Sequence, residues 1–401
     1  MNRRNPLWVV CVFLITLVAF GQGAPPTGVL GGITYEPIAT CDTARLDAIM
    51  GKELAAFTKT DVAFEKAKYP VKLYRVVYPS VVPERANHPT MASGLVAIPE
   101  SGATAMPMVS YQHGTVYGRT EVPSVPEDSM ETRLAIARFA AQGYIVIGAD
   151  YFGLGSSPEK DGYIVKESQQ QACLDMYLAA LAVLRNMKVT PKELFLSGWS
   201  QGGWVTAALL EKFEALRIPV TAAATACAPS DFYAGLTAIM FHPRPQDAPW
   251  KTTMVILSAF AYEHYYRVDG MAAALFRPEV YDVVKRFYLK EPVDLSKIPT
   301  ELDALLRKEW LDPVAFAESP YVRLLIQNHT FRRPIRTPTR TYYGELDEIV
   351  RPDLARLGAH FNRAFGADTV EAISTGQTNH RGTYMEALKR QKPWFDSLLK
   401  P

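Results

Sequence analysis

The chain has 401 residues, of which 48% are hydrophobic and 21% are charged. These proportions are typical of a globular protein and exclude disorder, collagen and coiled coil as the main architecture. The formal net charge of +2 gives no reason to expect a polyanionic partner such as a nucleic acid. Four cysteines in a chain of this length are too few for a disulfide-stabilised scaffold.

The N-terminus has the pattern of an export signal. Arg3 and Arg4 precede an apolar run over residues 7–20, which is shorter than the roughly 20 residues that a membrane-spanning helix needs. Small residues follow, and cleavage after Gly21 is favoured because it leaves Ala19 and Gly21 at the positions that signal peptidase reads. The sequence predicts a signal peptide over residues 1–21, a secreted or periplasmic location, and no integral membrane segment in the mature chain. An uncleaved anchor is the alternative.

Three cysteines remain after such cleavage: Cys41, Cys173 and Cys227. One disulfide can form among them, and the sequence does not identify the pair. Three buried thiols are an equal alternative.

Residues 22–70 form an N-terminal extension, and a strand-like pattern runs from residue 71 to residue 98. Short apolar segments then alternate with helical patterns up to residue 231, and again from residue 337. This alternation is typical of a mostly parallel sheet covered by helices on both faces. The predicted strands lie at 106–112, 144–149, 193–197, 220–227, 337–343 and 369–374, and the predicted helices at 131–142, 167–186, 202–213, 351–365 and 381–399.

The alternation breaks over residues 232–336, which contain helical stretches at 271–276, 280–290 and 300–306. This block is predicted to be an insertion in an α/β core formed by residues 71–231 and 337–401. Several of its aromatic residues are candidates for an acyl channel, with packing inside the insertion as the alternative for most of them. They are Tyr262, Tyr265, Tyr266, Phe276, Phe287 and Tyr288.

A G-x-S-x-G motif occurs at residues 198–202, with Ser200 at its centre. An apolar strand leads directly into it and a helix leads out, which is the setting of a nucleophile elbow. A serine hydroxyl needs a base to remove its proton, and in this arrangement the chain order is serine, acid, histidine. His380 lies in a loop between the last predicted strand and the last helix, where that base is expected.

The base needs a carboxylate that fixes its tautomer and stabilises its charged form. Asp347 follows a predicted strand in a G-x-x-D-x-x-V register, and it is the favoured acid. Asp231, at the end of the preceding strand, is the rival. Asp150 also follows a strand, where a turn-stabilising role is favoured over a catalytic one.

Acyl transfer also needs donors for the developing oxyanion. One is expected to be the backbone N–H of Gln201, directly after the candidate nucleophile. The other is expected from the loop at residues 112–115, where the Thr115 N–H is favoured and Gly114 is the alternative. His113 is then a structural residue of the loop.

Five segments together resemble the α/β-hydrolase superfamily and stand in its order: YQHGT at 111–115, DYFGLG at 150–155, GWSQGG at 198–203, YGELDEIV at 343–350 and TNHRG at 378–382. Within it, the chain is similar to the secretory lipase family. The resemblance implies an α/β-hydrolase fold with a central, mostly parallel sheet flanked by helices and a helical lid or cap at residues 232–336. It also implies that Ser200, Asp347 and His380 form a catalytic triad.

The sequence thus predicts a serine hydrolase that cleaves small-molecule or lipid esters of carboxylic acids. No cofactor is expected, and the sequence contains no P-loop, H-E-x-x-H or C-x-x-C motif. A serine aminopeptidase or dipeptidase is the alternative, in which Glu345 or Glu348 would bind the substrate amine. A non-catalytic binding module on the same scaffold is a third hypothesis.

Overall fold

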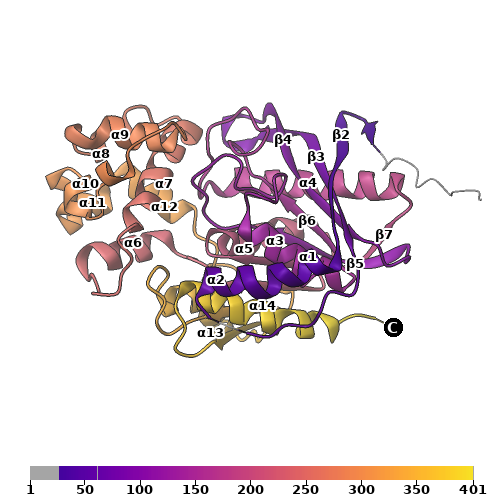
Figure 1. Ribbon diagram of the computed structural model, residues 1–401. Coiled ribbons are helices and arrows are strands. Elements are labelled where there is room, and N and C mark those ends of the chain that lie inside the picture. Colours follow the sequence, from indigo (N-terminus) through magenta and orange to yellow (C-terminus); the bar gives the residue numbers. More distant parts are fainter. Residues whose placement is uncertain (1–26, 61, 401) are drawn as a thin grey trace, which may run out of the picture.

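The computed structural model describes residues 27–60 and 62–400. The expected signal peptide at residues 1–21 lies outside this part of the chain. Among the helices that are described, none combines the length and the apolar character needed to cross a membrane. Figure 1 shows a twisted sheet with helices packed against it and a separate group of helices beyond one end of the sheet.

Ten strands form one sheet in the order β1-β2-β3-β4-β6-β5-β7-β8-β9-β10. Pairing is antiparallel from β1 to β4 and between β4 and β6, and parallel between all the other neighbours. Strands β6 and β8 are buried along their whole length, as expected for apolar strands covered on both faces. The strands are β1 (Gly28–Leu30), β2 (Ile33–Cys41), β3 (Val71–Val82), β4 (His88–Pro99), β5 (Ala105–Gln112), β6 (Ile145–Ala149), β7 (Thr190–Trp199), β8 (Ala222–Ala226), β9 (Thr339–Tyr343) and β10 (Val370–Ser374).

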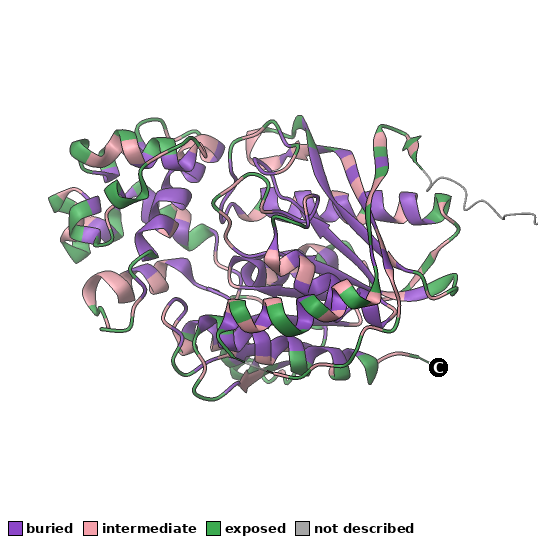
Figure 2. Ribbon diagram, viewed as in Figure 1, coloured by how far each residue is buried: buried purple, intermediate pink, exposed green. Residues whose placement is uncertain are grey.

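Helices cover both faces of the sheet and enclose two apolar cores. Helices α4 (Lys166–Asn186) and α5 (Gln201–Ala215) pack against each other and on one face. Helices α3 (Met130–Arg138) and α14 (His380–Asp396) pack on the other, together with α1 (Thr43–Ala48) and α2 (Leu54–Thr58). Helix α13 (Pro352–Ala364) connects β9 to β10. Figure 2 shows buried residues concentrated on the sheet and on the helix sides that face it.

The segment between β8 and β9 is helical and carries α6 to α12. Its longest helix, α7, is largely buried and forms the centre of this group. The helices are α6 (Phe232–Phe241), α7 (Lys251–Tyr266), α8 (Met271–Leu275), α9 (Pro278–Tyr288), α10 (Leu302–Leu305), α11 (Pro313–Glu318) and α12 (Pro320–Gln327).

The predicted fold class is confirmed: the sheet is mostly parallel and flanked by helices, and a helical insertion precedes β9. Several details differ from the sequence prediction. The insertion also contains α6 and α7, where the sequence analysis names no helical stretch. The N-terminal extension contributes β1 and β2 to the sheet, and the helix expected at residues 131–142 ends at Arg138, followed by a 3₁₀ turn over Ala140–Gln142. Cys41, Cys173 and Cys227 are buried free thiols, so the alternative without a disulfide describes this structure.

Candidate active site

Ser200 sits at the turn between β7 and α5. Its backbone has φ 58° and ψ −124°, in the region that non-glycine residues rarely adopt. The Ser200 N–H donates to the carbonyl oxygen of Ala226 at 2.9 Å, which ties the turn to the neighbouring strand β8. A strained backbone that its surroundings hold in place is common at functional sites, and this turn has the geometry of a nucleophile elbow.

The glycine at the end of the motif is required by close packing. A Cβ atom on Gly202 would overlap the carbonyl oxygen of Gln112, which belongs to the adjacent strand β5. The Gln112 oxygen belongs to the backbone, so it cannot move aside as the end of a flexible side chain would. The contact brings the start of α5 close to the loop after β5, where the second oxyanion donor is expected.

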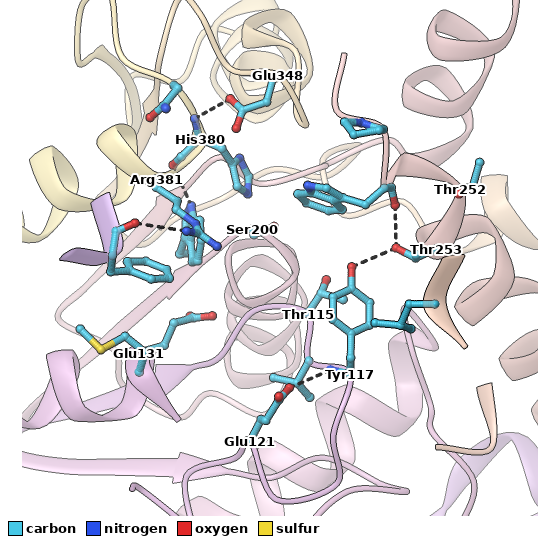
Figure 3. Close-up of a pocket in the computed structure, with 18 of the residues that line it drawn as sticks. Thr115, Tyr117, Glu121, Glu131, Ser200, Thr252, Thr253, Glu348, His380 and Arg381 are labelled. Carbon is cyan, nitrogen blue, oxygen red and sulfur yellow. Dashed lines mark hydrogen bonds between the residues drawn. The ribbon is translucent and has the colours of Figure 1, made fainter. Parts of the chain in front are cut away.

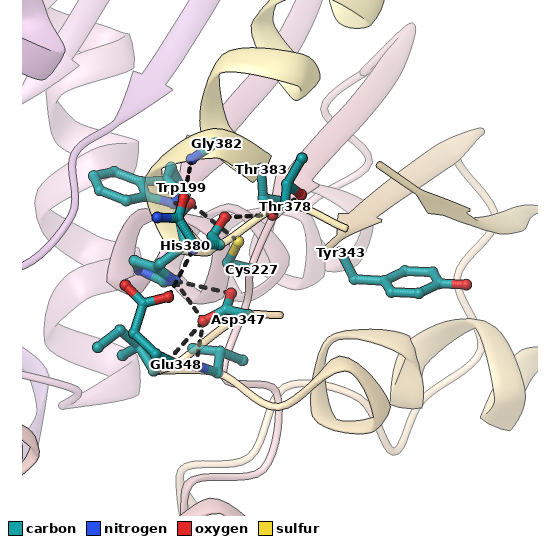
Figure 4. Close-up of polar contacts among 12 residues, drawn as sticks. Trp199, Cys227, Tyr343, Asp347, Glu348, Thr378, His380, Gly382 and Thr383 are labelled. Atoms are coloured by element: carbon teal, nitrogen blue, oxygen red, sulfur yellow. Dashed lines mark hydrogen bonds and ion pairs between the residues drawn. The ribbon is translucent and has the colours of Figure 1, made fainter. Parts of the chain in front are cut away.

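His380 and Asp347 form a hydrogen-bonded pair (Figure 4). Nδ1 of His380 lies 2.9 Å from Oδ2 of Asp347, and both side chains are buried. Asp347 Oδ1 accepts the N–H groups of Ile349 and Val350, each at 2.8 Å, which fixes the carboxylate in the loop after β9. Because Nδ1 faces the acid, Nε2 is the ring nitrogen left to act as a base.

The environment keeps Asp347 ionised. Burial raises the pKa of its carboxyl group, but the nearby His380 and the hydrogen bonds from His380, Cys227 and Val350 outweigh burial and hold the pKa below its ordinary value. An ionised Asp347 can hold the imidazole in one tautomer and stabilise its protonated form.

The other acids near the site have different partners. Asp231 caps α6 by accepting the N–H of Ala234 at 3.0 Å. Asp150 is buried and accepts the N–H of Ser124 and the hydroxyl of Ser93, as expected for a carboxylate that stabilises a turn.

Of the two glutamates near the predicted acid, one reaches the site. Glu348 accepts the backbone N–H of His380 at 3.0 Å and lines the same cavity. Glu345 is exposed and accepts the hydroxyl of Ser374, and it is not among the residues that line this cavity.

The loop after β5 supplies one candidate oxyanion donor. The Gly114 N–H is already bound by the carboxylate of Glu131, at 3.0 and 3.1 Å to its two oxygens. The Thr115 N–H has no acceptor among the described residues, and Thr115 lines the cavity next to Ser200. The Gln201 N–H, at the first position of α5, belongs to the helix start that lacks intrahelical acceptors. Between the N–H groups of Gly114 and Thr115, the geometry therefore favours that of Thr115 as the oxyanion donor.

One cavity brings these groups together (Figure 3). Its volume is about 900 Å³, within the size range of small-molecule sites, and both Ser200 and His380 line it. Its walls come from many separate parts of the chain, among them the end of α2, the loop after β5, the start of α3, the turn between β7 and α5, the start of α7 with the preceding loop, and the start of α14.

Several cavity residues could not be identified from the sequence. Phe57, Thr58 and Lys59 come from the N-terminal extension, and Trp250 precedes α7. The sequence predicts Glu131 only as part of a helix. Of the six aromatic residues proposed for an acyl channel, Phe287 lines the cavity and the other five are not among its lining residues. Those five belong to the apolar core or pack against it: Tyr262, Tyr265, Tyr266, Phe276 and Tyr288.

The described residues contain one cluster of potential metal ligands, Cys227, Asp347 and His380, whose ligand atoms lie within 4.8 Å of one another. Asp347 and His380 are already hydrogen-bonded to each other. Burial raises the pKa of the Cys227 thiol, so it stays protonated and is a poor ligand. The arrangement suits an acid–base pair better than a metal centre.

Comparison with known proteins gives one family match and many structural matches. Residues 130–255 match the Prolyl oligopeptidase family. No curated protein matches the sequence. Among solved structures, a protein from Legionella pneumophila is 22% identical with a TM-score of 0.80, covering 91% of this chain and 97% of that one.

Two further structural relatives are enzymes by name. The rice cell wall degrading esterase LipA from Xanthomonas oryzae is 19% identical with a TM-score of 0.77, covering 91% of this chain and 98% of its own. Candida antarctica lipase A in its closed state is 16% identical with a TM-score of 0.62, covering 91% of this chain and 83% of its own. At these identities the likeness establishes a shared fold.

Proposed function

The chain has the α/β-hydrolase fold, and on this premise we propose that it is a serine hydrolase that cleaves carboxylic esters through an acyl-enzyme on Ser200. The observation that carries the proposal is that His380, paired with the buried Asp347, lines the same cavity as Ser200, and that Ser200 has a strained backbone at the elbow. The family match over residues 130–255 and the esterase and lipase folds support the coarser assignment to serine hydrolases.

In the proposed reaction, Nε2 of His380 takes the hydroxyl proton of Ser200 as its oxygen attacks the ester carbonyl. The carbonyl oxygen becomes an oxyanion that the N–H groups of Thr115 and Gln201 stabilise. His380 then gives its proton to the leaving alcohol, and the acyl group remains on Ser200. Water attacks the acyl-enzyme with His380 again as the base, which releases the carboxylic acid and restores the serine.

An ester is the favoured substrate because the cavity is open and lined partly by large aromatic side chains. Tyr117 and Trp250 are 39% and 40% exposed to solvent, and both line the cavity. Such surfaces suit an apolar acyl or alcohol group. Of the four acidic side chains that line this cavity, Glu121, Glu131 and Glu348 already accept backbone N–H groups, which makes them weaker candidates for binding a substrate amine.

A peptidase is the second candidate, and the match to the Prolyl oligopeptidase family favours it. The two are separated by measuring kcat/KM for a series of p-nitrophenyl acyl esters and a series of aminoacyl-p-nitroanilides on one preparation. We expect turnover of the esters and little or no turnover of the anilides. A higher kcat/KM for the anilides would replace the esterase assignment by a peptidase.

Export through a signal peptide at residues 1–21 is also a proposal. It rests on the basic start, the apolar run and the small residues that follow it. N-terminal sequencing of protein recovered from the periplasm or medium of an expressing bacterium is expected to begin at Gln22. An intact N-terminus in the cytoplasmic fraction would contradict it.

A further inference from the structure

A carboxylate outside the proposed triad is bound to the loop that carries the oxyanion donor. Glu131, in the first turn of α3, is partly buried and accepts the Gly114 N–H through both oxygens. Figure 3 shows Glu131, Thr115 and Ser200 around the same cavity. Gly114 directly precedes Thr115, so the orientation of the Gly114 backbone sets the direction of the Thr115 N–H.

The contact depends on glycine at position 114. A Cβ atom there would lie 2.7 Å from Oε1 of Glu131, closer than real Cβ atoms approach. The absence of a side chain lets the carboxylate reach the backbone amide, so the Gly114–Glu131 contact is built into the loop.

Two tyrosine hydroxyls link Glu131 by hydrogen bonds to α14, the helix that begins at His380. The Tyr111 hydroxyl donates to Oε2 of Glu131 at 2.9 Å, and the hydroxyl oxygens of Tyr111 and Tyr384 are also 2.9 Å apart. Because Tyr111 has one proton and an ionised carboxylate can only accept, Tyr384 must donate to Tyr111. Tyr384 lies one turn after His380 in α14 and stacks on Trp199, with ring centroids 4.7 Å apart.

We propose that Glu131 is a positioning residue for hydrolysis: its carboxylate holds the Gly114 amide so that the Thr115 N–H points at the developing oxyanion. This inference rests on the proposed function. Glu131 itself touches no reacting atom in this scheme and acts only through the loop.

The charge of Glu131 is expected to matter within the working pH range. Burial raises the pKa of Glu131 to about 7, against the lowering effects of the Tyr111 hydroxyl, the Gly114 N–H and His380. Below that pH the protonated carboxyl is a weaker acceptor, and the loop is held less firmly. The titratable and charged groups that face Glu131 or share its cavity are Tyr111, Tyr117, Tyr151, Tyr384, His380, Arg381, Lys59, Glu121, Asp128 and Glu348.

The test compares kcat and KM from pH 5 to pH 9 for wild-type protein, E131A, E131Q and E84Q on a soluble short-chain p-nitrophenyl ester. We expect E131A to lower kcat by about 10- to 100-fold with little change in KM, because misaligned donors act on the transition state. E131Q should recover part of the loss, since its amide oxygen still accepts an N–H. In the pH profile of kcat, E131Q should also lack the part of the decline toward low pH that the titration of Glu131 near pH 7 causes in wild type.

Glu84 provides the matched control. It accepts the N–H of Ser168 at the start of α4, burial likewise raises its pKa, and it does not line the cavity. E84Q should therefore keep the wild-type pH profile.

A second variant covers the case in which E131A does not fold. Tyr111→Phe removes a donor that lowers the pKa of Glu131, so the acid limb should move to higher pH. The same change in an E131Q background should produce no such shift.

Three outcomes would count against the inference. A kcat for E131A within twofold of wild type, or equal shifts caused by Y111F with and without Glu131, would overturn it while leaving the proposed function intact. No turnover of any ester or anilide by wild-type protein, together with no fluorophosphonate adduct on Ser200, would overturn the proposed function as well.

Discussion

Nδ1 of His380 lies 2.9 Å from the carboxylate of Asp347, although the two residues are 33 positions apart and follow different strands. The loop after β9 carries the acid, and the start of α14 carries the imidazole. Both open at the carboxyl edge of the sheet, where β7 also delivers Ser200. The proposed chemistry depends on this convergence.

The pair can be tested by removing the charge of the acid. D347N should lower kcat by roughly 10³- to 10⁴-fold, because an amide does not select the tautomer or stabilise imidazolium. Steady-state kinetics on a p-nitrophenyl ester measure the effect. D231N is the matched control: it keeps a good helix cap on α6 and should leave kcat within about twofold. Comparable losses of kcat in D347N and D231N would contradict the assignment of Asp347, rather than Asp231, as the acid that pairs with His380.

Glu131 is expected to make stability depend on pH. The folded-state pKa of about 7 lies above the ordinary value of 4.5, so the native protein binds this proton more tightly than the unfolded chain does. The resulting stabilisation is full below about pH 4.5 and is lost as pH rises through about 7. E131Q should therefore gain melting temperature relative to wild type as pH rises over this window. A difference in melting temperature that does not change between pH 4.5 and pH 8 would contradict this.

A buried ion pair ties the helical insertion to the core. Lys290, after α9, lies 2.9 Å from Asp161 and also donates to the carbonyl of Val116, and both charged side chains are 5% exposed. K290A leaves Asp161 buried without its partner and should cost about 3–5 kcal/mol in the free energy of unfolding. Urea titration of K290A and wild type measures this difference in the free energy of unfolding.

The exposed pair Arg286–Glu291 is the control for this change, with side chains 55% and 49% exposed. R286A should change stability by no more than about 1 kcal/mol. The double variant K290M/D161N should be more stable than K290A alone. Equal stability of K290A and wild type would show that the insertion is held by other contacts.

Two glycines should respond to alanine with opposite signs. Gly202→Ala places a Cβ atom against the Gln112 carbonyl and should destabilise the fold by about 1–3 kcal/mol. Gly358→Ala, within α13 and with open space around the new atom, should stabilise it by about 0.5–1 kcal/mol. Chemical denaturation of both variants checks the pair. A neutral Gly202→Ala would mean that the elbow is looser than this packing indicates.

Local pattern was enough to predict the sheet from β3 onward and the loops that carry the candidate site residues. An apolar strand, a glycine-flanked serine and a helix follow one another at residues 193–213, so Ser200 could be placed without tertiary information. The same kind of pattern predicts His380 and Asp347 as the base and the acid, because each follows a strand at the same edge.

What could not be predicted depends on contacts between distant segments. Glu131 reads as an ordinary acid in the first turn of a helix, and only the packing of α3 beneath the loop after β5 brings it to Gly114. Phe57 reaches the cavity because α2 packs on α14. The aromatic residues of the insertion have no pattern that separates core from cavity, and only Phe287 of the six lines it.

The most direct test of the central claim is to map the adduct formed with a fluorophosphonate by peptide mass spectrometry, in parallel with ester hydrolysis by S200A. The account predicts one adduct, on Ser200, in native but not heat-unfolded protein, and no measurable turnover by a folded S200A variant. An adduct on another residue, or ester turnover retained in S200A, would contradict it.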